Sequence, residues 1–188
     1  MSSASTPATS ATVWDIDPAH TGVHFSVKHL MVSTVRGEFG KIAGTVTLDP
    51  RDISRSSIVA SIDTASISTR EPQRDAHLRS PDFLDVEKYP TIEFRSTRLA
   101  RTADGFDVSG ELTIRGVTRP VVLKVETSDT ELRDPFGNLK RGASATAKIN
   151  RKDFGLVWNV GLESGGFLVG DEVKIEIDVE VALRAEAA

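Results

Sequence analysis

The chain has 188 residues, of which 39% are hydrophobic and 27% are charged, and its formal net charge is −4. This length and composition are typical of one soluble globular domain. The chain contains no cysteine, which excludes thiol catalysis, disulfides and cysteine–zinc sites. It also lacks a cluster of basic residues interleaved with aromatic residues, so we expect no nucleic-acid partner.

The first twelve residues are rich in Ser, Thr and Ala, a composition that predicts a disordered N-terminal tail over residues 1–12. They have neither the basic start nor the apolar run that a secretory signal needs. No stretch approaches the ~18 apolar residues of a membrane span. The sequence therefore predicts a cytoplasmic protein with no membrane span, one domain over 13–184 and a C-terminal tail at 185–188.

Alternation of apolar and polar side chains, typical of β-strands with one buried face, runs from Val13 to Arg184. It is clearest in Val173–Leu183, eleven residues with apolar side chains at every odd position. A strand of this length, at ~3.3 Å per residue, extends roughly 36 Å and suits a tilted barrel. Shorter runs separated by Gly, Pro and Asp bring the total to about eight strands. We therefore predict an all-β fold, an eight-stranded antiparallel lipocalin-like barrel.

The segment Thr69–Pro90 lacks this alternation. Asp75 precedes Arg79 by four residues, an order that favours an ion pair on a helix surface. Pro81 cannot continue that helix, and Ser80 before it has the properties of an N-cap, so a second helical piece is predicted to begin there. We expect a short helical insert near residues 70–85 that covers one mouth of the barrel.

The stretch DPAHTGVHFSVKHL, Asp17 to Leu30, holds three of the four histidines of the chain. Alternation points His24 to solvent and His29 inward at the strand end, while His20 lies in a turn. The ligands of one metal ion must converge on one point, so we predict no metal site here. His29, together with His77 of the insert, leaves open an acid–base or metal-dependent enzyme.

Aromatic residues are spread over most of the predicted strands, and a closed barrel gathers them in its interior. They either fill the core completely or line a cavity for a long apolar ligand. The alternation alone leaves both interpretations open. A filled core favours a further alternative, a stress-related scaffold protein that presents its outer surface.

Several segments, in order, resemble the YceI-like family of lipocalin-like polyisoprenoid-binding proteins. They include WDIDPAHTGVHFSVKHL, STVRGEFGKIAGTVTLD, RDAHLRSPDFLDVEKYPTIEF and INRKDFGLVWN, and the resemblance extends from Trp14 to Val181. It implies an eight-stranded barrel with a hydrophobic tunnel, no catalysis, and no cofactor apart from a bound isoprenoid lipid. The ligand implied is a long chain such as a polyprenyl diphosphate or a quinone tail. Family members are often exported. The resemblance also leaves open that the protein forms a homodimer.

We therefore predict non-catalytic storage, carriage or sequestration of an isoprenoid lipid. If its head group is a diphosphate, Arg74 or Arg79 would pair with the oxygens; the alternative is that both pair with nearby acids. The expected tunnel wall consists of inward apolar positions: Phe25, Val27, Phe94, Ile114, Trp158, Phe167, Ile177 and Val179. The expected mouth and lid consist of His29, Arg74, His77, Leu78, Arg79 and Phe83.

Overall fold

Twelve antiparallel strands in the residues that the structure describes (10–127, 131–163 and 165–185) form one sheet that closes on itself. In this computed structural model the strands are β1 (Thr12–Ile16), β2 (Gly22–His29), β3 (Ser33–Phe39), β4 (Ile42–Leu48), β5 (Ser57–Asp63), β6 (Ile67–Ser68), β7 (Thr91–Arg101), β8 (Phe106–Ile114), β9 (Val117–Thr127), β10 (Leu132–Arg133), β11 (Leu139–Asn150) and β12 (Val169–Leu183). One α-helix, α1 (Pro72–Arg79), and three short 3-10 helices, η1 (Ile53–Arg55), η2 (Thr64–Ser66) and η3 (Arg151–Phe154), lie between them.

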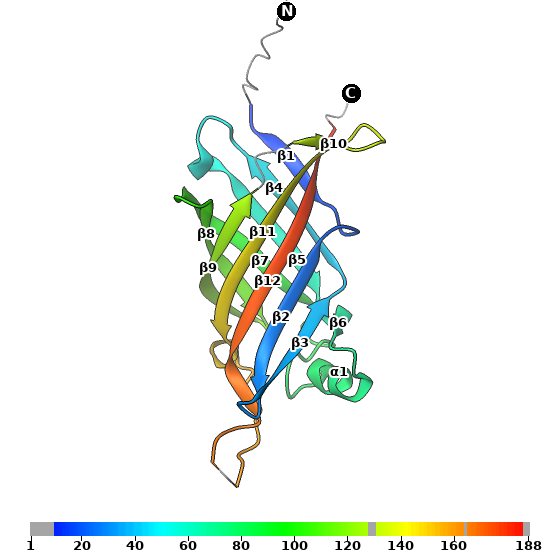
Figure 1. The fold of residues 1–188 in the computed structure, drawn as a ribbon, viewed down its shortest axis with the longest axis vertical. Helices are drawn as coiled ribbons and strands as arrows, with labels where there is room; N and C mark the ends of the chain where they lie inside the picture. The colour runs from blue at the N-terminus through cyan, green and yellow to red at the C-terminus, as the bar shows by residue number, and fades with distance from the viewer. Residues whose placement is uncertain (1–9, 128–130, 164, 186–188) are drawn as a thin grey trace, which may run out of the picture.

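The ring of the barrel follows the order β11, β9, β8, β7, β5, β4, β1 and β12, and β12 then pairs with β11 to close it. This confirms the predicted all-β, eight-stranded antiparallel barrel with one short helix. Figure 1 shows the strands steeply tilted around an elongated barrel, with the start of β1 and the end of β12 at its upper end and α1 at its lower end. The predicted tails lie largely outside the described residues, at 1–9 and 186–188, although Thr12 already belongs to β1.

At two positions of the ring, two short strands lie end to end in place of one long strand. β12 pairs with β1 through Val181–Leu183 and with β2 through Val169–Asp178, so β1 and β2 follow each other along the same edge. β3 and β4 continue the wall in the same way. Beyond β3, the wall is thin, because β6 has only two residues. The chain then leaves the sheet, and the insert at 69–90 lies beside this thin part of the wall (Figure 1).

The insert begins as predicted but continues differently. Glu71 is the N-cap of α1 and accepts hydrogen bonds from the next turn, and the helix ends at Ser80. The predicted second helical piece is wrong, because residues 81–84 form a turn. The predicted ion pair of Asp75 with Arg79 is also wrong: Asp75 is buried and accepts hydrogen bonds from the backbone and hydroxyl of Thr69.

Buried side chains form two clusters. The smaller one, Trp14, Ile16 and Val181, lies in the upper part of the barrel. The larger one joins the insert to the strands: Phe83 and Leu84 of the insert are buried with Ile92, Phe94, Val108, Leu112 and Ile114 of β7 and β8. Burial of a side chain of this size contributes about 1.5–3 kcal/mol, so the insert is a packed part of the barrel. No helix in the described ranges is long and apolar enough to cross a membrane.

Candidate functional site

The barrel encloses a cavity of about 920 Å³. Its walls are the inward faces of the strands, and most of the lining side chains are apolar. Cavities of this size lie at the upper end of the range for ligand sites, about 300–1,000 Å³. At the ~30 Å³ that one water takes in the liquid, the space corresponds to roughly 30 non-hydrogen atoms.

Six of the eight predicted tunnel residues line this cavity: Phe25, Val27, Phe94, Ile114, Ile177 and Val179. Two glycines make room for the aromatic ones. A Cβ at Gly37 would lie 2.3 Å from the Phe25 ring, and a Cβ at Gly110 would lie 2.5 Å from the Phe94 ring. The inward alternation of β11 continues as the small residues Ala143, Ala145 and Ala147, which leave the interior open.

Trp158 and Phe167 do not line the cavity, so this part of the prediction is wrong. Both residues lie in the irregular segment between η3 and β12, where strand alternation does not apply. Trp158 packs its ring edge-on against His77, 4.6 Å between centroids, and against Phe83. Phe167 is 56% exposed, and its ring faces the ammonium of Lys152.

The predicted mouth residues separate in the structure. Leu78 and Phe83 reach the cavity, whereas His29, Arg74, His77 and Arg79 do not line it. His29 ends β2, and its carbonyl oxygen accepts hydrogen bonds from the hairpin turn that follows. His77 is within hydrogen-bond distance of the Asp82 carboxylate, with its Nε2 at 2.9 Å. The two histidines therefore have separate surroundings, and the expected catalytic pair does not form.

Arg74 and Arg79 bind protein backbone rather than a cavity ligand. Arg74 Nε donates to the hydroxyl of Thr69, and Nη2 donates to the Thr69 carbonyl oxygen. Arg79 donates to the carbonyl oxygens of Ala65 and Ile67. Both the diphosphate role and the acid-pairing alternative are thus replaced by hydrogen bonds to the chain. The local sequence does not predict these hydrogen bonds, because the acceptors of Arg79 lie 12 and 14 residues away.

Two further arginines donate hydrogen bonds to backbone carbonyl oxygens at the lower end of the barrel. Arg115 donates to the carbonyl oxygens of Pro81 and Gly155, which joins the insert to the segment after η3. Arg151 is 4% exposed, and burial lowers its pKa, an effect that the nearby Asp171 carboxylate opposes. Its guanidinium donates to the carbonyl oxygens of Leu156, Trp158, Val169 and Gly170. We call this network of four arginines with the insert the lower floor.

The cavity reaches the surface at the opposite end. Its exposed lining residues all belong to the ends of strands or to loops beside the chain termini: Pro50, Arg51, Asp52, Arg101 and Thr127. Half-buried Arg141 of β11 lines the same end. We call these six residues the upper mouth. The sequence signal for Arg141 was present, because it continues the inward alternation of β11. Arg101 follows a register shift between Ser96 and Arg98, so the alternation that begins at Ile92 and Phe94 would point it outward.

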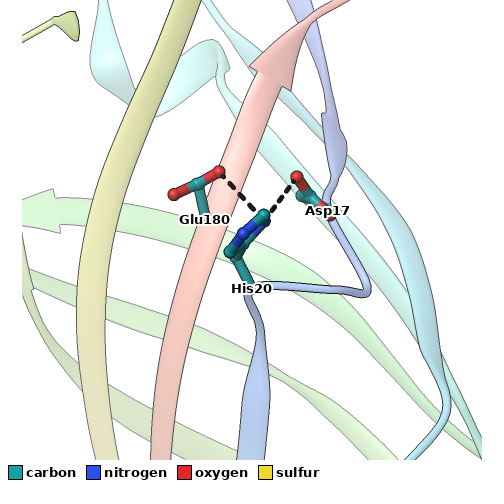
Figure 2. Close-up of side chains that lie close together, drawn as sticks. All are labelled: Asp17, His20 and Glu180. Carbon is teal, nitrogen blue, oxygen red and sulfur yellow. Dashed lines mark hydrogen bonds and ion pairs between the residues drawn. The ribbon is translucent and has the colours of Figure 1, made fainter. Parts of the chain in front are cut away.

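A polar cluster lies outside the cavity, at the turn between β1 and β2. Figure 2 shows His20 between the carboxylates of Asp17 and Glu180, and its Nδ1 lies 3.0 Å from Asp17 Oδ2 and 3.5 Å from Glu180 Oε1. The Lys140 ammonium donates to both carboxylates. The hydrogen bond from Lys140, with a further one from His20, holds the pKa of Asp17 well below its ordinary value.

The same cluster is the candidate metal centre within the described part of the chain. The ligand atoms of Asp17, His20 and Glu180 lie within 4.8 Å of one another. A metal ion there would have to displace the Lys140 ammonium, which already bridges the two carboxylates. The geometry therefore favours an ion-pair network that joins the β1–β2 turn to β11 and β12.

Comparison with known proteins gives a consistent result. Residues 14–181 match the model of the YceI-like domain. A UPF0312 protein of Vibrio cholerae is 38% identical over 145 residues, which cover 77% of this chain and 76% of that protein. The crystal structure of Burkholderia cenocepacia BcnA matches with a TM-score of 0.73 at 24% identity, covering 88% of this chain and 98% of that one.

A polyisoprenoid binding domain from Saccharophagus degradans, implicated in plant cell wall breakdown, matches with a TM-score of 0.66. The identity is 13%, and the match covers 92% of this chain and 99% of that one. At these identities, the two solved structures establish a shared fold.

Proposed function

This chain belongs to the YceI-like domain family, and on that premise we propose that it binds one long isoprenoid chain in the barrel cavity without transforming it. The observation that carries the proposal is the apolar cavity of about 920 Å³, open at the upper mouth and closed by the lower floor. The fold shared with a polyisoprenoid binding domain supports the same ligand class. Storage, carriage and sequestration all use this one binding step.

The cavity can supply a useful affinity by burial alone. A ligand of roughly 30 non-hydrogen atoms, at a ceiling of ~0.3 kcal/mol per atom, gains at most about 9 kcal/mol. This limit corresponds to a dissociation constant somewhat below about 1 μM. Apart from the alanines of β11, most of the apolar wall side chains are branched or aromatic, and such side chains suit a methyl-branched chain.

The alternatives receive less support. A cavity of this volume opposes a scaffold with a filled core. An acid–base enzyme would need titratable groups that converge on the cavity, but His29 and His77 lie outside its lining. His24 is among the lining residues, but its side chain is 45% exposed and its Nδ1 lies 3.7 Å from Glu38 Oε2. The Asp49 and Asp52 carboxylates, which do line it, accept hydrogen bonds from backbone amides of their own turn. Binding therefore fits the geometry better than catalysis.

The first test is extraction of the purified protein with organic solvent, followed by mass spectrometry. We expect an apolar chain of about 30 carbon atoms or fewer to co-purify, or to bind the delipidated protein when it is added as a prenyl alcohol. A straight-chain alcohol with the same number of carbon atoms serves as the comparison. An empty extract, together with no uptake of either alcohol, would reject the proposal.

Substitutions at two neighbouring residues of β11 test whether the ligand binds in the cavity. Ala145 lines the cavity and is 6% exposed, whereas Thr146 is exposed on the outer face. We expect Ala145→Phe to occupy part of the cavity and weaken binding of the prenyl alcohol at least tenfold. Thr146→Phe adds an aromatic ring outside and should leave binding unchanged. Equal effects of the two substitutions would place the ligand elsewhere.

A further inference from the structure

Exposed apolar side chains gather at the lower end of the barrel, outside the cavity. They belong to the turn between β2 and β3, where Met31 and Val32 are 72% and 80% exposed, and to the segment between η3 and β12. Figure 1 shows both loops at the lower end, where the second projects beyond the strands. We call the following exposed residues the apolar tip: Leu30, Met31, Val32, Val160 and Phe167.

The two loops of the apolar tip are joined by direct contacts. The Leu30 amide donates to the Leu168 carbonyl oxygen at 2.9 Å. Met31 lies against Gly166, because a Cβ at Gly166 would be 2.9 Å from the Met31 sulfur atom. The exposed apolar side chains therefore form one connected patch.

Within the projecting segment, Val160 and Phe167 point to opposite sides. The Leu168 amide donates to the Val160 carbonyl oxygen, and the next pair inward is Gly161 with Phe167. Successive residues of an extended chain point to opposite faces. The apolar tip thus exposes side chains in more than one direction, as a knob does and a flat face does not.

The turn between β2 and β3 has an unfavourable backbone for its sequence. The Val32 amide donates to the His29 carbonyl oxygen, so Leu30 and Met31 occupy the two central positions. Their φ angles are 51° and 63°. A turn with two positive φ angles favours Asn-Gly, because side chains such as Leu and Met are strained there. Folding alone does not account for these two exposed side chains, which points to a contact outside the chain.

A lipid bilayer fits this knob better than a protein partner. A stable protein interface takes about 20–30 residues from each side, whereas the apolar tip has five. A fluid lipid phase surrounds side chains that point in different directions, and a protein surface meets only one side of them. The ammonium of Lys152, 5.5 Å from the centre of the Phe167 ring, lies where a cation can reach the polar level of a bilayer.

The charges beside the apolar tip nearly balance. Lys152 pairs with Asp171 at 2.9 Å. Lys28 is exposed near the turn, and Asp153 and Glu163 are exposed on the side of the projecting segment. Attraction to anionic lipids is therefore small, and burial of apolar side chains must supply the binding energy. Docking driven in this way depends little on salt.

We propose that the apolar tip docks the protein on a lipid bilayer, with its side chains at the boundary between head groups and acyl chains. The docking surface goes beyond the proposed function and does not include the cavity. The upper mouth lies at the opposite end of the barrel, so the docked protein holds that mouth away from the bilayer.

The test is co-sedimentation of the purified protein with phosphatidylcholine vesicles. The wild type should bind and should stay bound in about 0.5 M salt. Leu30→Asn combined with Met31→Gly supplies the residues that the turn favours, so this double variant should be at least as stable in urea. It should nevertheless bind the vesicles at least about tenfold more weakly. Its affinity for a prenyl alcohol added without vesicles should equal that of the wild type.

A matched pair of valines tests the location. Val32→Ser should weaken vesicle binding about three- to tenfold, whereas Val122→Ser should leave it unchanged, because Val122 is exposed on the outer face of β9. Tryptophan fluorescence reports the insertion directly. With vesicles, the emission of Val32→Trp should move to shorter wavelength, and that of Phe136→Trp, on the hairpin at the opposite end (Figure 1), should not.

Failure of the wild type to bind the vesicles would overturn the inference, and so would equal binding by the double variant or loss of binding in salt. Analytical ultracentrifugation gives a further outcome. A dimer of the wild type that the double variant abolishes would assign the apolar tip to a second copy of the chain and overturn the inference. A wild type that docks on vesicles but takes up no prenyl alcohol would instead reject the proposed function and support the docking surface.

Discussion

The Arg141 guanidinium lies 4.8 Å from the centre of the Trp14 ring, which is only 2% exposed. The charged rim of the cavity therefore rests directly on the smaller buried cluster of the barrel. The Trp14 indole N–H donates to Thr12 Oγ1 at 2.9 Å, which fixes the ring in this place. Stability of the upper barrel and geometry of the upper mouth are linked through this one contact.

Replacement of this ring should therefore cost much stability. We expect Trp14→Ala to lower the free energy of unfolding by about 3–5 kcal/mol, because it leaves a cavity beside Ile16 and Val181. Equilibrium unfolding in urea measures the change. Phe136→Ala is the control, since that ring is 90% exposed and its loss should stay within about 0.5 kcal/mol. Similar losses for both variants would contradict the role given to Trp14.

The glycine opposite Phe94 should be needed for the shape of the cavity wall. A Cβ at Gly110 would lie 2.5 Å from the Phe94 ring and 2.7 Å from the Arg95 carbonyl oxygen. We expect Gly110→Ala to lower the free energy of unfolding by about 1–3 kcal/mol through overpacking. Gly142→Ala on β11 is the matched control, because no atom lies within 4 Å of its Cβ position.

The second step of this experiment is a double variant, measured in the same urea series. Phe94→Leu in the Gly110→Ala background removes the ring that the new methyl group meets, so it should restore part of the lost stability. A Gly110→Ala variant as stable as Gly142→Ala would show that the ring moves aside without cost.

The sequence predicts the barrel and most of its inner wall because both depend on strand alternation. Phe25 and Ile177 could be assigned inward because their neighbours alternate over many residues, and the structure pairs β2 with β12 in that register. The prediction for Trp158 and Phe167 is wrong because alternation does not extend into the segment between η3 and β12. Their positions depend on contacts with distant elements, His77 and Lys152 among them.

The empty volume and the arginine contacts could not be predicted from the sequence. Whether a barrel is filled depends on how side chains from all strands meet, and Ala145 has an effect only because Val125 and Ile177 lie beside it. The acceptors of Arg79 are carbonyl oxygens, which every residue has, so no sequence pattern marks them. A cytoplasmic location and a homodimer stay predictions that the structure does not test.

Arg79 should contribute to the stability of the lower floor. It donates to the Ala65 and Ile67 carbonyl oxygens and joins α1 to the thin wall at β6. We expect Arg79→Ala to lower the free energy of unfolding by about 1.5–3 kcal/mol, since hydrogen bonds to a charged donor are lost.

Binding data on the same variant separate a role in stability from a role in binding. Affinity for the prenyl alcohol should stay at the wild-type value in Arg79→Ala, because Arg79 does not line the cavity. Loss of prenyl alcohol binding in Arg79→Ala, with stability retained, would instead give Arg79 a direct role in binding the ligand.

The Asp17 network should make the stability of the barrel sensitive to acid. Hydrogen bonds from Lys140 and His20 lower the folded-state pKa of Asp17 below its value of 3.8 in the unfolded chain. The stabilisation is therefore complete above about pH 5 and is lost progressively as the pH falls through and below the unfolded-state pKa. We expect Asp17→Asn to reduce the free energy of unfolding at pH 7 by about 1.5–3 kcal/mol.

Urea unfolding between pH 3 and pH 7 measures this dependence. Asp17→Asn should lose less stability than the wild type on going to pH 3, because its side chain has no carboxylate to take up a proton when the chain unfolds. Asp104→Asn, in the exposed turn between β7 and β8, controls for the removal of one carboxylate and should follow the wild-type curve. If Asp17→Asn also kept the wild-type slope, the acid sensitivity would arise from carboxylates elsewhere, and the Lys140 contact would be only a surface ion pair.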